Sequence, residues 1–165
     1  MPDFVTIGVY GFDEAGFFQA LQNAGVDTFC DLRARRGVRG SAYAFANSER
    51  LQARLAGLGI RYLHRPELAP SQALRQRQAD TDKSNKTAKR QRTVLSPSFV
   101  DAYKQEVLAE FDSTGFVTGL GPDARVVALF CVEREPAACH RSLLAARLAE
   151  EQAVQVTHLM PANSS

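Results

Sequence analysis

The segment Arg125-Val-Val-Ala-Leu-Phe-Cys-Val-Glu-Arg-Glu-Pro-Ala-Ala-Cys-His-Arg141 gives the clearest indication of how this chain folds. After Arg125, the run to Phe130 is apolar on both faces, which is typical of a central strand in a parallel sheet covered by helices on each side. Pro136 then suits the first turn of a helix, where its missing N–H is not needed. We therefore predict a buried strand, a short loop and a helix over residues 137–151.

Strands and helices are predicted to alternate along the rest of the chain. Runs of β-branched and aromatic residues predict strands at residues 4–10, 26–32, 60–64 and 154–159. Apolar residues at helical spacing predict helices at residues 14–24, 47–59 and 98–111. Such alternation implies right-handed crossovers, so we expect an α/β fold, a three-layer α/β/α sandwich around a mainly parallel sheet of about five strands.

One segment departs from this alternation. We expect residues 1–160 to form a single α/β domain, followed by a short polar tail at 161–165, because 165 residues with 45% hydrophobic content suffice for one core. Within that domain, residues 71–92 hold seven basic and two acidic side chains, a local charge of +5. We expect this basic polar insertion to be mobile or functional rather than packed.

The composition favours a cytoplasmic protein with reduced thiols. No stretch approaches the roughly 20 apolar residues of a membrane span, and the first residues lack the features of a signal peptide, so we expect no membrane partner. Three cysteines in a domain of this size do not suggest a disulfide framework. The sequence shows no clear apolar surface stripe from which to infer an oligomeric state.

Residues with chemically active side chains lie at the carboxyl-terminal ends of several predicted strands or at the start of the helix that follows. They are Asp31 and Arg33, His64, Cys131 and Glu133, and then Cys139, His140 and Arg141 near the start of the last helix. Because parallel strands end at one edge of a sheet, where open α/β folds bind ligands, we expect these side chains to share a pocket. The alternative is a buried ion network that only fixes the loops.

The candidate catalytic residues are Cys131, Glu133, His140 and Asp31. Cys131 is a possible nucleophile, since nearby arginines and a helix N-terminus would favour its thiolate, but a small core residue would look the same. Glu133 or His140 would move a proton, and Asp31 would orient a neighbouring group. These roles predict an enzyme, either a hydrolase or a group transferase.

The candidate substrate-binding residues are Arg33, His64 and Arg141. Together with backbone N–H groups near Pro136, they would bind an anion, because arginine offers two parallel hydrogen bonds to a phosphate. We therefore expect the partner to be a small anionic substrate that bears phosphate, such as a nucleotide.

We expect neither a metal nor a cofactor. Cys131, Glu133, Cys139 and His140 are acceptable zinc ligands, but adjacent helical residues point about 100° apart, which argues against Cys139 and His140 sharing an ion. The chain has no Cys-x-x-Cys pair and no phosphate-binding Gly-Lys-Ser/Thr loop, and its Gly8-x-x-Gly11 is too short for a dinucleotide fingerprint.

A nucleic-acid-binding protein is the alternative function. Basic residues of two segments would contact a phosphate backbone, namely Arg35, Arg36, Arg39, Lys86, Lys89, Arg90 and Arg92. Tyr43 and Phe45 would be available to stack on bases, although such residues more often pack in a core.

Four motifs occur in one order along the chain: Thr6-Ile7-Gly8, Asp31-Leu32-Arg33, Tyr62-Leu-His-Arg-Pro-Glu-Leu68 and Cys131-Val-Glu…Cys139-His140-Arg141-Ser142. Together they resemble the bacterial domain of unknown function numbered 488, over nearly the whole chain. The resemblance implies a small intracellular α/β domain and implies no established reaction. The chain departs from many relatives at Val9 and at residues 35–37, so no role is carried over to those positions.

Overall fold

The computed structural model of the chain describes residues 1–86 and 93–162. Five strands form one sheet with the order β3-β2-β4-β1-β5, and every neighbouring pair is parallel. The strands are β1 (Asp3–Ile7), β2 (Thr28–Asp31), β3 (Arg61–His64), β4 (Val126–Phe130) and β5 (Val156–Leu159). This arrangement confirms the predicted α/β fold with a parallel sheet.

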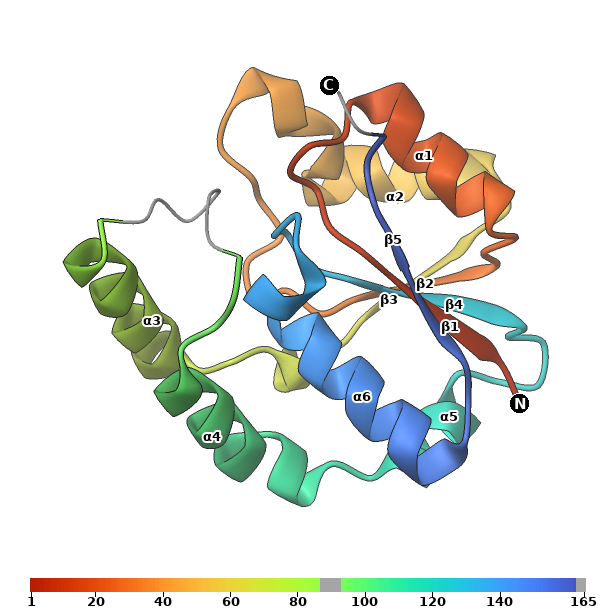
Figure 1. Cartoon of the computed structure of the whole chain (residues 1–165). Helices are drawn as coiled ribbons and strands as arrows, with labels where there is room; N and C mark the ends of the chain where they lie inside the picture. The colour runs from red at the N-terminus through yellow and green to blue at the C-terminus, as the bar shows by residue number, and fades with distance from the viewer. Residues whose placement is uncertain (87–92, 163–165) are drawn as a thin grey trace.

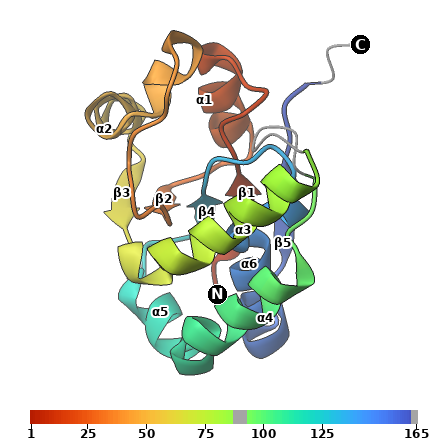
Figure 2. The same ribbon diagram turned by 90° about the vertical axis from the view of Figure 1, so that its left-hand side faces the viewer.

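Helices cover both faces of the sheet. The α-helices are α1 (Glu14–Asn23), α2 (Ser48–Gly57), α3 (Gln72–Ser84), α4 (Pro97–Glu106), α5 (Ser113–Gly119) and α6 (His140–Gln152). Helices α1 and α2 lie on one face, while α6 and α5 lie on the other with α4 and α3 beside them (Figures 1 and 2). No helix in the described part of the chain combines the length and the apolar character needed to cross a membrane.

Strand β4 lies between β2 and β1, and its residues Val127–Phe130 are fully buried. Side chains alternate along a strand, so neighbouring residues of β4 contribute to different cores. Phe130 packs in the cluster that contains Phe17 and Phe29, under α1 and α2, whereas Leu129 belongs to the cluster that contains Leu144 of α6. The apolar character of both faces of this strand thus follows from its central place.

The chain between β3 and β4 holds more helix than the sequence predicts. The helix predicted over residues 98–111 ends at Glu106, a short 3-10 turn (Leu108–Glu110) follows, and α5 begins after Asp112. The side chain of Asp112 accepts a hydrogen bond from the backbone N–H of Gly115, which caps α5. Helix α5 was not predicted, because a helix of seven residues is too short to show a clear apolar periodicity.

The expectation that the basic insertion stays unpacked is wrong for α3. The Ser71 hydroxyl accepts a hydrogen bond from Leu74 N–H and caps this helix, and Leu74 and Gln78 are buried one turn apart. The Gln78 side chain accepts a hydrogen bond from Ser96 N–H and donates one to Asp82, which ties α3 to the segment before α4. Residues 87–92 lie outside the described part of the chain.

Candidate functional site

The carboxyl ends of three neighbouring strands bring the predicted site residues to one edge of the sheet. Asp31 pairs in register with His64 of β3 and with Phe130 of β4, so Cys131 follows directly beside the end of β2. Helix α6 begins at His140 on the same edge, because the Leu32 carbonyl oxygen lies 3.3 Å from the His140 ring. The structure therefore brings together the residues that the sequence places on separate segments.

Asp31 and Arg33 form a buried ion pair at the end of β2. The guanidinium donates from Nε to Asp31 Oδ1 at 2.9 Å and from Nη2 to Oδ2 at 2.8 Å. The Tyr62 hydroxyl also donates a hydrogen bond to Oδ2, at 2.7 Å. Tyr62 was not among the predicted site residues, although its place two positions before His64 puts it on the same face of β3. Burial and the hydrogen bond to Asp31 raise the pKa of Tyr62 to about 12.

The side chains of Arg33 and His64 form hydrogen bonds to backbone carbonyls of the protein. The remaining guanidinium nitrogen of Arg33 donates to the Ala46 carbonyl at 2.9 Å, and the guanidinium lies 4.7 Å from the centre of the Phe130 ring. His64 donates from Nε2 to the Arg33 carbonyl at 2.6 Å. Arg33 is 3% exposed, so in this structure it fixes the loop after β2 and does not face solvent as an anion-binding group.

A second group, the thiol–imidazole cluster, consists of Cys131, Cys139 and His140. The Sγ atoms of Cys131 and Cys139 each lie 3.8 Å from Nδ1 of His140, and all three atoms lie within 4.8 Å of one another. The three residues are buried, with exposed fractions of 6%, 2% and 6%. His140 donates from Nε2 to the Leu32 carbonyl, which leaves Nδ1 of the neutral ring unprotonated and directed at the sulfurs.

The local backbone explains why Cys139 and His140 point together. Residues Pro136–Ala138 form a 3-10 turn, and Cys139 has φ −136° and ψ 146°, an extended conformation before the first residue of α6. The prediction of a helix from residue 137 is therefore wrong at its start. The argument from helical spacing against a shared ion fails for the same reason, because Cys139 is not helical.

The two thiols of the cluster influence each other. A hydrogen bond to Cys139, together with burial, raises the pKa of Cys131 well above its usual range. Burial also opposes ionisation of Cys139, but the hydrogen bond from Cys131 and the nearby His140 and Arg141 outweigh it and lower the pKa of Cys139. Of the two thiols, Cys139 is therefore the more acidic and Cys131 the less acidic.

Arg141 holds the loop between β4 and α6. Its guanidinium is fully buried and donates to the Glu133 carbonyl at 2.7 Å and to the Arg134 carbonyl at 3.2 Å. Its Nε has no acceptor among the described residues. A Cβ atom at Gly8 would lie 1.9 Å from the Glu133 carbonyl oxygen, so only glycine allows β1 to end this close to the loop. Arg141 thus fixes the backbone of this loop. Glu133, whose carbonyl accepts one of these hydrogen bonds, is 3% exposed.

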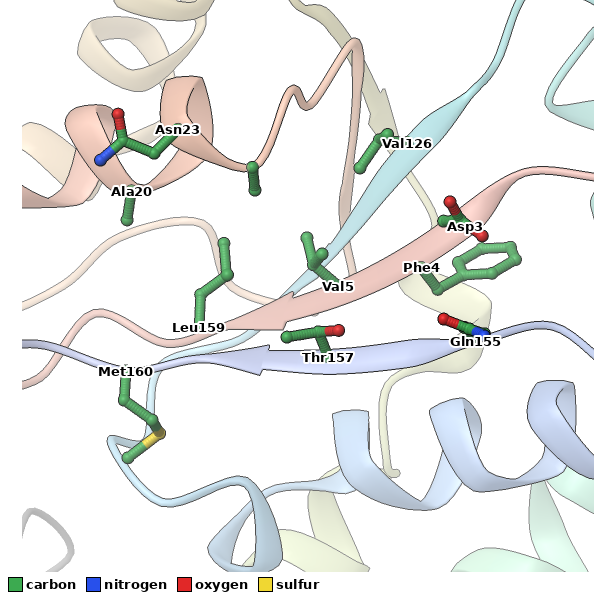
Figure 3. Close-up of a pocket in the computed structure, with 11 residues that line it drawn as sticks. Asp3, Phe4, Val5, Ala20, Asn23, Val126, Gln155, Thr157, Leu159 and Met160 are labelled. Atoms are coloured by element: carbon green, nitrogen blue, oxygen red, sulfur yellow. The ribbon is translucent and has the colours of Figure 1, made fainter.

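Two surface hollows lie away from these groups. One of about 460 Å³ runs along β1 and β5 and is lined by Val5, Thr157 and Met160 together with Asn23 of α1 (Figure 3). The other, of about 380 Å³, lies between η2 (Pro66–Leu68) and the segment around Glu106 and Phe116. Neither hollow is lined by the thiol–imidazole cluster or by the Asp31–Arg33 pair. The candidate site is therefore identified by the chemistry of its side chains and not by the volume of a hollow.

The residues predicted to bind nucleic acid differ in their exposure to solvent. Arg35, Arg39 and Lys86 are exposed, whereas Arg36 is half-buried and the hydrogen bond with the Tyr62 side chain raises its pKa. Phe45 is 2% exposed and packs against Phe17 and Phe18, so it belongs to the core and is not available to stack on a base. The remaining residues of this prediction, Lys89, Arg90 and Arg92, lie outside the described residues.

The comparisons with known proteins agree with the motifs at this edge of the sheet. The profile of the family described as Domain of unknown function DUF488 matches residues 15–148. The chain belongs to the DUF488 family. Neither a curated protein nor a solved structure matches the chain. Since the description of DUF488 names no reaction, the function of this DUF488 protein has to be argued from its site.

Proposed function

We propose that this DUF488 protein is an enzyme, a hydrolase or group transferase, that acts on an anionic, phosphate-bearing small molecule at the carboxyl edge of its sheet. The observation that carries the proposal is the thiol–imidazole cluster, in which two sulfurs lie 3.8 Å from one imidazole nitrogen. Glu133 and Arg141 are buried on the same loop and helix start. Burying so many polar groups has a desolvation cost, so packing alone does not explain them.

The ion pair at the end of β2 serves this cluster by fixing its backbone. Asp31 and the Ala46 carbonyl hold the side chain of Arg33, while His64 holds the Arg33 carbonyl. The carbonyl of Leu32, which lies between Asp31 and Arg33 in the sequence, accepts the hydrogen bond from His140. Asp31, Arg33 and His64 are therefore positioning residues in this proposal, and the reacting groups are Cys131, Cys139, His140 and Glu133.

Arginines of three loops supply the proposed contact with the anion. Arg36 follows β2, Arg65 follows β3 and Arg134 follows β4, so all three lie around the same edge of the sheet. Each is half-buried rather than fully buried, unlike Arg33 and Arg141. Arg65 and Arg134 lie within ion-pair distance of Glu67 and Glu135. A partly exposed guanidinium still has further donors for phosphate oxygens, which favours an anionic substrate over a neutral one.

A panel of phosphate-bearing compounds, including nucleoside phosphates and sugar phosphates, tests the proposal. Each compound is incubated with the purified protein, and its loss is followed by mass spectrometry and by release of inorganic phosphate. We expect turnover of at least one compound and a loss of at least about 100-fold in the His140→Ala variant. The matched control is Cys30→Ala, which removes a buried thiol in β2 outside the cluster. Absence of turnover across the panel, or unchanged turnover in His140→Ala, would rule out the proposed function.

Nucleic-acid binding is the second candidate, and exposed Arg35 and Arg39 after β2 favour it. Salt separates the two functions, because contacts to a phosphate backbone weaken by orders of magnitude between roughly 50 and 200 mM salt. A labelled single-stranded oligonucleotide, titrated at both salt concentrations, should bind with such a slope if this candidate is right. In that case Arg35→Ala and Arg39→Ala together should reduce the slope by about two.

A further inference from the structure

We infer that Cys131, Cys139 and His140 form a binding site for a thiophilic divalent cation such as Zn²⁺. Two thiolates and one imidazole are ligands that zinc prefers, and all three come from the short stretch between the end of β4 and the first residue of α6. The site uses the residues of the proposed function, but it does not depend on turnover.

The distances between the ligand atoms suit one ion. Zinc binds sulfur at about 2.3 Å and imidazole nitrogen at about 2.0 Å, so neighbouring ligand atoms of a tetrahedral site lie about 3.6 Å apart. Both Sγ–Nδ1 distances in the cluster are 3.8 Å, and no pair among the three atoms exceeds 4.8 Å. An ion at the centre of these atoms therefore requires only a small movement of the two sulfurs.

A hydrogen bond already orients the imidazole of His140 for binding a metal ion. Zinc-binding histidines characteristically donate their other ring N–H to a carbonyl or carboxylate, which fixes the ring and its tautomer. Here Nε2 donates to the Leu32 carbonyl, and Nδ1 faces the sulfurs with its lone pair. The Leu32 carbonyl is itself fixed, because the side chains of Asp31 and His64 hold Arg33.

The charges of such a site also balance. When Zn²⁺ binds, each thiol loses a proton to solvent and forms a sulfur–zinc bond, so the two thiolates neutralise the cation and no oxidation is involved. A neutral unit of this kind is compatible with burial, whereas a lone thiolate or cation is not.

The described part of the chain contributes three ligands to the group. Three protein ligands and an open fourth position are typical of catalytic zinc sites, whereas structural sites have four. If the proposed function holds, the fourth ligand is a water or a substrate oxygen, and Glu133 on the same loop is the carboxylate that would take a proton from that water.

Titration of the reduced, chelator-treated full chain with Co²⁺ and then Zn²⁺ tests the inference. We expect one equivalent of Co²⁺ to bind with a sulfur-to-cobalt charge-transfer band in the near ultraviolet, and Zn²⁺ to abolish that band by displacement. Cys131→Ala, Cys139→Ala and His140→Ala should each weaken binding by more than the roughly 10–100-fold that is typical for loss of an outer-shell partner. Cys30→Ala is the matched control and should leave the band and the stoichiometry unchanged.

A ligand exchange guards against variants that fail to fold. His140→Cys keeps three ligands, so it should still bind one Co²⁺, with a stronger charge-transfer band from its third sulfur. The inference is overturned if the wild type binds no stoichiometric Co²⁺, if the band is absent, or if Cys139→Ala binds as well as the wild type. Metal binding without turnover of any compound would leave the site standing and remove the proposed function. Turnover by a wild type that binds no stoichiometric Co²⁺ would leave the proposed function standing and remove the site.

Discussion

Among single residues, Asp31 and Arg33 show how the edge of the sheet is held. Both are almost fully buried, and the carboxylate accepts two hydrogen bonds from the guanidinium and one from Tyr62. An ion pair in this environment is worth little compared with apolar residues, but removing one partner leaves the other charge buried and unpaired. The pair therefore matters for position more than for net stability.

Asp31→Asn should destabilise the protein by about 3–5 kcal/mol, because it leaves the Arg33 guanidinium buried without its counter-charge. Denaturant unfolding measures this change. Glu14→Gln is the matched control, since the Glu14–Arg50 pair is partly exposed and its loss should cost less than about 1 kcal/mol. Equal effects of the two substitutions would show that Asp31 and Arg33 are not buried as described.

Cys30 should remain unreactive in the folded protein. Burial raises the pKa of Cys30 to about 12, so the neutral thiol persists at pH values where a free cysteine, with a pKa of about 8.5, forms the reactive thiolate. Alkylation at about pH 8.5, followed by peptide mapping, should leave Cys30 unlabelled until the chain is unfolded. Rapid labelling of Cys30 in the native state would contradict its place in the middle of β2.

Among the elements, the loop from β4 to α6 contributes most to the site, and its start against β1 depends on Gly8. The backbone N–H groups of Val9 and Tyr10 both donate to the Val132 carbonyl, which fastens the end of β1 to this loop. The position of the Glu133 carbonyl against Gly8 leaves no room for a side chain.

Gly8→Ala should destabilise the protein by about 1–3 kcal/mol, because the added methyl group forces the loop away from β1. Gly57→Ala is the matched control, since a Cβ atom at the end of α2 meets nothing within 4 Å and should stabilise the protein by about 0.4–1 kcal/mol. Thermal or denaturant unfolding distinguishes the two signs. If Gly8→Ala were neutral, the close approach of β1 and the loop would be wrong.

The start of α6 shows which part of an element cannot be predicted from its own sequence. Pro136 is equally suited to the 3-10 turn that forms and to the helix that we predicted. The Ala137 carbonyl of the turn accepts a hydrogen bond from the backbone N–H of Leu95, a residue far away in the sequence. The one-residue break at Cys139 is what directs its sulfur and the His140 ring at each other. A geometry that depends on such a break requires the folded structure.

For the whole molecule, the alternation of strands and helices sufficed to predict the fold and the convergence of Asp31, His64 and Cys131. Asp31 and His64 end their strands and Cys131 follows β4, and parallel strands end at the same edge whatever their order. The strand order itself and the partners Tyr62 and Ala46 depend on contacts between distant segments, so local periodicity did not reveal them.

The proposed site and the hollow along β1 and β5 lie at different places on the molecule (Figures 1 and 3). The hollow is lined mostly by apolar and amide side chains, with Asp3 as its acidic residue, and it contains none of the thiol, imidazole or guanidinium groups discussed above. Ligands should therefore bind at the carboxyl edge of the sheet and not in this hollow.

Amide chemical-shift mapping by NMR, with a mixture of nucleoside phosphates added to the labelled protein, tests this prediction most directly. We expect shifts in the loops that follow β2, β3 and β4, around Arg36, Arg65 and Arg134, and at the start of α6. Shifts confined to β1 and β5 around Asp3 and Thr157, or no shifts at all, would contradict this prediction.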